Sequence, residues 1–119
     1  MTKRPEVDFS NGHFSIPFLL FKMTEDLAEW ENKSGVFVFT SLKQTGDNPY
    51  LKIIYVGCTL NFSNVKYYLT ESVSTHKPTH ICFYPCADKP NPRKIADSLI
   101  EYYKPEVIHS GFSVKKAQS

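Results

Sequence analysis

The chain is poor in arginine, and this scarcity bears on what it can bind. Of 14 lysine and arginine residues among 119, only Arg4 and Arg93 are arginine. Arginine is the usual residue for bidentate contacts with phosphate or carboxylate groups. The formal net charge of +2 is also too small to indicate nucleic-acid binding by itself. The composition therefore counts slightly against phosphate chemistry.

Long apolar runs are missing as well. No segment approaches the roughly 18 apolar residues of a membrane span. The most apolar early segment, residues 14–23, is interrupted by Pro17 and followed by no signal-peptide cleavage pattern. The three cysteines, an odd number, favour reduced thiols inside a cell. We therefore expect a soluble protein with no membrane partner, cytoplasmic, or nuclear in a eukaryotic cell.

Aromatic residues are abundant instead, with nine phenylalanines and seven tyrosines. Such side chains can stack on a ligand, but they more often fill a core. A chain of 119 residues has room for one domain with one modest core. We expect an N-terminal extension over 1–33 packed on that core, a domain over 34–110 and a flexible tail over 111–119.

Two β-rich segments form the centre of the predicted fold. Residues 36–40 and 51–56 are dense in β-branched and aromatic side chains, and the turn-rich segment 41–50 between them predicts an antiparallel hairpin with a long tip. The second strand is expected to stop at Gly57, where glycine lets the backbone approach a ligand. A third strand is expected over 81–84.

Helices are expected on both sides of these strands. Thr24 predicts the start of a short helix ending near Asn32, whereas residues 14–23 fit either a strand broken at Pro17 or a helix start. The apolar spacing after Asn61 predicts a helix to about residue 69. A last helix is expected from the cap Asn91 and Pro92 to a point before Pro105, with Tyr102 and Tyr103 on its apolar face. The predicted class is α+β, in the order β-β-α-β-α, with a three-stranded antiparallel sheet flanked by helices and a short N-terminal helical extension.

Two short motifs lie one hairpin apart, Gly35-Val36-Phe37 and Tyr55-Val56-Gly57. They resemble the two motifs that name the GIY-YIG nuclease family, in particular its phage homing endonucleases. Cys58–Phe62 resembles the entry to its first helix, and Ser98–Pro105 resembles its Glu-x-x-Leu-Ile-x-x-Tyr-x-Pro helix. The resemblance covers about residues 34–108.

The resemblance implies hydrolysis of phosphodiesters. In that family the second motif tyrosine acts on a water nucleophile, an arginine on the first helix stabilises phosphate charge, and a glutamate on the last helix holds a divalent metal. A further tyrosine or histidine on the first helix assists. These groups suit the reaction, which needs an activated nucleophile, neutralised phosphate charge and a hard cation.

When the family's functional residues are compared one by one with this sequence, the residues that shape the fold are kept and the charged ones are replaced. Tyr55 and Gly57 are retained, and Tyr55 is a vestigial catalytic candidate. The first motif tyrosine is replaced by Phe37, which has no hydroxyl. The arginine position falls at Val65 and the metal-binding glutamate position at Ala96. Both are apolar.

Two further positions depart from the family. The assisting tyrosine or histidine falls at Leu69, although Tyr68 is adjacent, and the asparagine that often follows the last helix falls at Ile108. Nearby charges face other directions, since one residue is a rotation of about 100° on a helix. This applies to Lys66 and Asp97, whereas Arg93 could reach a phosphate from the helix start.

The histidine and cysteine side chains suggest a zinc site, but this interpretation is weaker than that of buried structural cysteines. His80, Cys82 and Cys86, with Cys58 elsewhere, are the candidate ligands. Along an extended strand, Cys82 and Cys86 would lie about 13 Å apart, too far to share one ion unless Pro85 bends the chain. We expect buried structural cysteines and no metal.

Lysine and tyrosine side chains could instead line a surface that binds nucleic acid through backbone contacts and stacking, or they could simply solvate the domain. The candidate binding residues are Phe37, Gly57, Lys66, Tyr68, Arg93 and Lys94. We expect a catalytically inactive GIY-YIG-like module that binds nucleic acid or a protein partner without a cofactor. The alternative is a divergent endonuclease that uses displaced residues and Mg²⁺.

Overall fold

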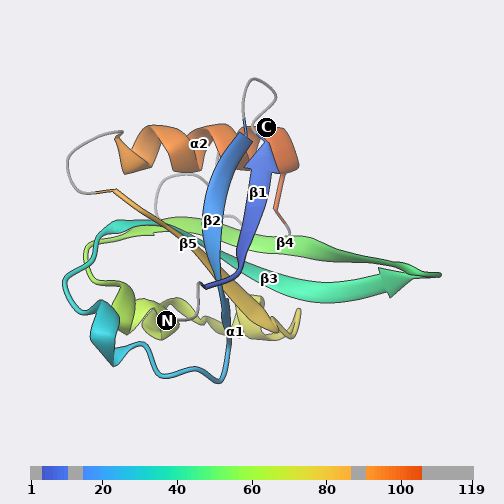
Figure 1. Cartoon of the computed structure of the whole chain (residues 1–119), viewed down its shortest axis with the longest axis horizontal. Coiled ribbons are helices and arrows are strands. Elements are labelled where there is room, and N and C mark those ends of the chain that lie inside the picture. The colour runs from blue at the N-terminus through green and yellow to red at the C-terminus, as the bar shows by residue number, and fades with distance from the viewer. Residues whose placement is uncertain (1–3, 11–14, 87–90, 106–119) are drawn as a thin grey trace.

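The protein, described here from a computed structural model, is built on a five-stranded antiparallel sheet (Figure 1). The structure describes residues 4–10, 15–86 and 91–105. The strands lie in the order β1-β2-β5-β3-β4, so β1 and β4 are the edges. The elements are β1 (Glu6–Ser10), β2 (Ser15–Lys22), the 3₁₀ helix η1 (Ala28–Trp30), β3 (Gly35–Thr45), β4 (Asn48–Thr59), the 3₁₀ helix η2 (Phe62–Tyr68), α1 (Glu71–Ser74), β5 (His80–Pro85) and α2 (Pro92–Tyr103).

Each face of the sheet carries its own apolar core, because successive side chains of a strand point to opposite faces. Helix α2 covers one face, and η1, η2 and α1 lie on the other (Figure 1). The α2-side core contains Phe9, Ile16, Phe18, Val36, Val38, Ile53, Val56, Cys82, Cys86, Ala96 and Leu99. The η2-side core contains Phe21, Leu27, Phe37, Phe39, Ile54, Tyr55, Phe62, Val65, Val73, Ile81 and Phe83.

The expected three-stranded sheet with an N-terminal helical extension is wrong. Residues 6–10 form β1 and residues 15–22 form β2, and β2 pairs with β5, so both strands belong to the sheet itself. Pro17 does not break β2 because pairing with β5 begins only at Leu19, opposite Phe83, so the missing N–H lies outside the paired part of the two strands. The tail expected over 111–119 and Ile108 lie outside the described residues.

The helix expected after Thr24 is also wrong, since only the single turn η1 forms there. The acidic side chains that favoured a helix are used in turns instead. The Glu25 carboxylate accepts a hydrogen bond from the backbone N–H of Lys22 at 2.9 Å, and the Asp26 carboxylate accepts one from Ala28 at 2.9 Å.

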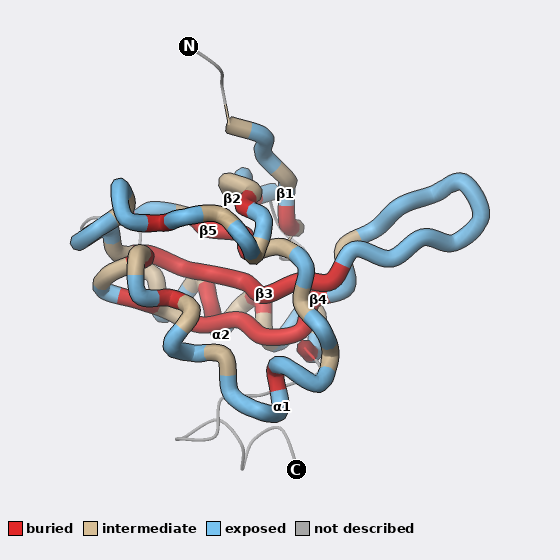
Figure 2. The backbone as a smooth tube through the Cα atoms, turned by 90° about the horizontal axis from the view of Figure 1, so that it is seen from below, coloured by how far each residue is buried: buried red, intermediate tan, exposed pale blue. Residues whose placement is uncertain are grey.

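The predicted central strands are confirmed, but the long loop expected between them is wrong. Strand β3 continues to Thr45 and β4 begins at Asn48, so a two-residue turn, Gly46-Asp47, joins them. Gly46 has a φ of 61°, the positive value that a type II′ hairpin turn needs at its first central residue. We call residues 42–52 the hairpin arm, which projects beyond the rest of the sheet (Figures 1 and 2).

The strand predicted over 81–84 and the two helix starts are confirmed. Asn61 accepts a hydrogen bond from the backbone of Ser63 at 3.1 Å, and Asn91 caps α2 by accepting one from Arg93 at 2.9 Å. The helix after Asn61 is a 3₁₀ helix, and Tyr102, expected on the apolar face of α2, is 53% exposed.

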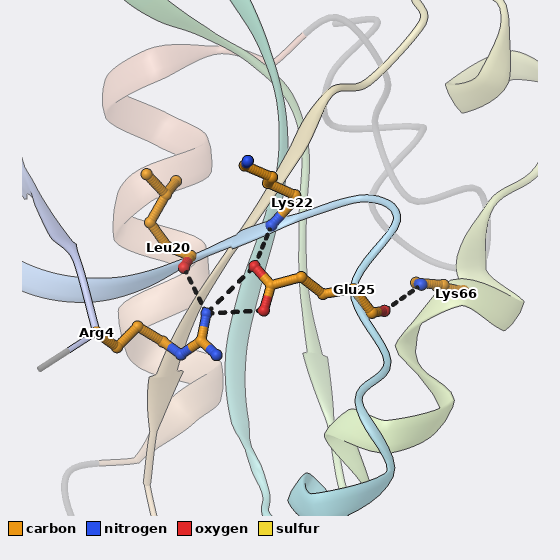
Figure 3. A network of polar contacts seen from close by, with 5 residues as sticks. All are labelled: Arg4, Leu20, Lys22, Glu25 and Lys66. Atoms are coloured by element: carbon orange, nitrogen blue, oxygen red, sulfur yellow. Dashed lines mark hydrogen bonds and ion pairs between the residues drawn. The ribbon is translucent and has the colours of Figure 1, made fainter. Parts of the chain in front are cut away.

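A polar network at the end of β2 joins three parts of the chain (Figure 3). The Arg4 guanidinium donates to the Leu20 carbonyl at 3.0 Å and pairs with the Glu25 carboxylate at 3.0 Å. The Lys66 ammonium donates to the Glu25 backbone carbonyl at 2.7 Å. Burial alone would raise the pKa of the Glu25 carboxyl, but the hydrogen bonds from Lys22 and Arg4 outweigh it and lower this pKa.

Candidate functional site

The two motif segments named in the sequence lie side by side in the sheet. Strands β3 and β4 pair in a register that places Phe37 opposite Gly57 and Phe39 opposite Tyr55. Directly opposite residues of an antiparallel pair share a face. The motif side chains therefore meet on the η2 side of the sheet, where Phe37 and Tyr55 both belong to the buried core.

An aromatic cluster forms around Phe37. Its ring centroid lies 5.9 Å from that of Tyr55 and 5.0 Å from that of Tyr68. Gly57 leaves the space that these rings occupy, since a Cβ there would lie 2.7 Å from the Phe37 Cζ atom. Tyr68, which is 37% exposed, connects the cluster with solvent. The structure thus brings together four candidate residues: Phe37, Tyr55, Gly57 and Tyr68.

Tyr55 is buried in this cluster, and its acidity is weakened. Only 6% of its surface is exposed. Burial raises the pKa of its hydroxyl to about 12, Tyr68 adds to the rise, and the positive charge of Arg93 opposes it. At neutral pH the hydroxyl keeps its proton, so Tyr55 is poorly suited to take a proton from water.

Because its pKa is raised above the ordinary value near 10, Tyr55 should make stability depend on alkaline pH. The contribution is fully present below pH 10 and is lost as pH rises toward about 12. We expect wild type to lose more stability than Tyr55→Phe over this interval, measured by urea unfolding at stepped pH. Parallel losses for the two proteins would show that Tyr55 ionises as an exposed tyrosine does.

The two positions that the resemblance assigns to catalytic charge are part of the two cores. Val65 is completely buried in the η2-side core, with Leu69 half-buried against it. Ala96 is 1% exposed and belongs to the α2-side core. The sheet lies between Val65 and Ala96, so the two positions do not share one site.

The candidate basic residues are dispersed. The Lys66 ammonium donates its hydrogen bond to the backbone carbonyl of Glu25, which lies just after β2. Arg93 and Lys94 are exposed on the first turn of α2. The positive charge of Arg93 opposes the effect of burial, which raises the pKa of both the Tyr55 hydroxyl and the Cys58 thiol.

The described residues do not fit the divalent ion that the resemblance implies. Ala96, at the glutamate position, offers a buried methyl group and no oxygen ligand. Among the described residues, no group of three or more histidine, cysteine or acidic side chains could hold a metal ion. Cys82 and Cys86 are buried thiols without a disulfide, and burial raises the pKa of Cys82 to about 12.

Sequence reasoning missed the hairpin arm, which contains two of the exposed large side chains. Leu42 is 49% exposed and Tyr50 is 50% exposed. The signal that could have located the arm is Gly46-Asp47, a two-residue glycine turn between segments able to pair.

In the part of the chain that the structure describes, no helix has the length and apolar character needed to cross a membrane. Comparisons with protein-family models, with curated proteins and with solved structures found no match to this chain.

Proposed function

We propose that this chain is a GIY-YIG-like domain that no longer hydrolyses nucleic acid and serves to bind it. The observation that carries this proposal is the burial of apolar side chains at the former charge positions, with Val65 and Ala96 in cores on opposite faces of the sheet. Hydrolysis of a phosphodiester needs charge placed around one phosphate. Two buried hydrocarbon side chains cannot provide it.

The retained tyrosine supports the same conclusion. Tyr55 keeps its place in the motif, but its burial and raised pKa suit a core side chain better than an activator of water. Its contacts with Phe37 and its fit above Gly57 give a structural reason for keeping the motif without the reaction.

Binding would use exposed aromatic and basic side chains. Tyr67 is 86% exposed beside Tyr68 on η2, and Arg93 and Lys94 lie at the start of α2. Aromatic rings stack on bases with little regard for sequence, and cations neutralise phosphates. The domain should therefore bind the sugar-phosphate backbone of the nucleic acid, with little sequence preference.

Binding is tested by fluorescence anisotropy with a labelled 20-base-pair duplex and the matching single strand, in EDTA and at increasing salt. We expect the logarithm of affinity to fall linearly with that of salt concentration, with a slope near −0.9 for each duplex phosphate neutralised. Absence of binding at low salt would overturn the proposal and favour a protein partner.

One observation favours the alternative of a divergent, metal-dependent endonuclease. Arg93 and Asp97 are exposed on α2, which packs against β4, and the positive charge of Arg93 opposes the burial that raises the pKa of Tyr55. Cleavage of DNA in Mg²⁺ that requires both Arg93 and Asp97 would support this second function.

A further inference from the structure

The hairpin arm is a free-standing two-stranded ribbon. Pairing of β3 with β5 ends at Thr40, opposite His80, and β4 is an edge strand, so beyond that point β3 and β4 pair only with each other. The register continues from Leu42 opposite Leu51 to Thr45 opposite Asn48. These three steps extend about 10 Å at roughly 3.4 Å per residue. Figure 2 shows the arm exposed along almost its whole length.

The two faces of this ribbon differ in chemistry, because opposite residues share a face and neighbours alternate. One face, here called the polar arm face, carries the pairs Lys43–Tyr50 and Thr45–Asn48. The other carries Leu42–Leu51 and Gln44–Pro49, and Leu51 packs against the α2-side core. The apolar face is therefore anchored to the domain at its base.

The base of the arm is held firmly. The backbone N–H of Thr79 donates to the Thr40 carbonyl at 2.8 Å, and the Thr79 hydroxyl accepts from the backbone N–H of Leu42 at 2.8 Å. A ribbon fixed in this way presents its side chains with little loss of freedom on binding, which favours affinity.

Charge distinguishes the arm from the opposite end of the molecule. The arm contains two lysines and one acid, Asp47, and Lys77 lies two residues before the Thr79 clamp. The acidic segment 25–31, with Glu25, Asp26, Glu29 and Glu31, lies around η1, far from the arm in Figure 1. A polyanion approaching the molecule would be steered toward the arm.

We propose that the hairpin arm enters the major groove of duplex DNA with its polar arm face toward the bases. The inference rests on the proposed nucleic-acid-binding function and adds the element and the ligand. The major groove of B-form DNA, about 12 Å wide, admits a two-stranded ribbon, whereas the major groove of A-form RNA is too narrow for side chains to read. Lys43 contacts a phosphate or a guanine edge, and Thr45 and Asn48 near the tip reach base edges.

Tyr50 completes this face. It is 50% exposed and directly opposite Lys43, so the two residues are neighbours on the same face of the ribbon. Its apolar body packs along the sugar and thymine methyl groups of the groove wall, while its hydroxyl donates to phosphate. The sugar and phosphate part of this contact carries no sequence information, in keeping with the low sequence preference of the proposed function.

The test compares matched variants on the labelled duplex. Lys43→Ala and Tyr50→Ala should each weaken binding about five- to tenfold, and Lys43→Ala should also reduce the salt slope by about 1. Gln44→Ala, on the opposite face of the same ribbon, should bind as wild type does. All three positions are exposed, and urea unfolding of each variant checks that the fold is unchanged.

A second readout identifies the groove. Bound wild type should protect guanine N7, a major-groove atom, from methylation by dimethyl sulfate, because the ribbon occupies that groove. Protection confined to adenine N3, in the minor groove, would overturn the inference. The inference would also be overturned if both arm variants bound as tightly as wild type while the double variant Arg93→Ala, Lys94→Ala bound more weakly. That result would leave the proposed function standing. If wild type binds no nucleic acid, both proposals fail together.

Discussion

Val65→Arg, which places a charge where the resemblance to GIY-YIG nucleases expects an arginine, should destabilise the domain by about 3 to 5 kcal/mol rather than confer hydrolysis. Val65 is completely buried between η2 and the sheet, in a core that includes Phe62 and Phe83. A guanidinium placed there would lose its hydration without gaining a carboxylate partner. Since domains are stabilised by only about 5 to 15 kcal/mol, much of the population could unfold.

Tyr67→Arg is the matched control for this substitution. Tyr67 lies on the same 3₁₀ helix but is 86% exposed, so arginine there should change the free energy of unfolding by no more than about 0.5 kcal/mol. Urea unfolding followed by circular dichroism measures both variants. Equal stability of Val65→Arg and Tyr67→Arg would show that position 65 faces solvent, as a catalytic position would.

Gly35→Ala should cost about 3 kcal/mol, the second large effect. A Cβ at Gly35 would overlap the backbone carbonyl oxygen of Tyr84 and lie 2.9 Å from the Cα of Pro85. Both atoms belong to the backbone of β5, which pairs with β3 at this point. The backbone cannot move aside, because Ser34 and Cys86 hold the strand ends together through hydrogen bonds of 2.7 and 2.8 Å.

Gly57→Ala provides the comparison, since it adds the same methyl group to the other motif. Its Cβ would meet ring atoms of Phe37 at 2.7 Å and of Tyr55 at 3.0 Å, and the far ends of side chains can shift. We expect a loss of about 1 to 2 kcal/mol. A larger loss for Gly57→Ala than for Gly35→Ala, measured by urea unfolding, would contradict the packing described for the two glycines.

The elements that sequence predicted well are those specified by local signals. Residues 36–40 and 51–56 are dense in β-formers, and Asn91 with Pro92 marks the start of α2 in the chain itself. Strand β1 was missed, and the choice between strand and helix for residues 14–23 stayed open, because the signals that settle both are long-range. Pro17 suggested a break, and only the end of the β2–β5 pairing at Leu19 explains why a proline is tolerated there.

The candidate site was likewise predicted only where local signals specify it. The motifs placed Phe37, Tyr55 and Gly57 together because pairing of adjacent strands follows from a hairpin. Their spacing could not show that Val65 and Ala96 lie in different cores, since this depends on which face of the sheet each helix covers. The arm was missed because turn-forming residues between two strands suggested a loop, whereas the strands pair as far as the two-residue turn.

The central claim is that the domain binds nucleic acid without cleaving it, and one measurement tests it most directly. End-labelled duplex, single-stranded and branched DNA are incubated with the protein in Mg²⁺ or Mn²⁺ and separated on a denaturing gel. We predict that every substrate stays at full length under conditions where anisotropy shows it bound. Cleavage by wild type that disappears in Tyr55→Phe would contradict the claim, because it would make Tyr55 a catalytic residue.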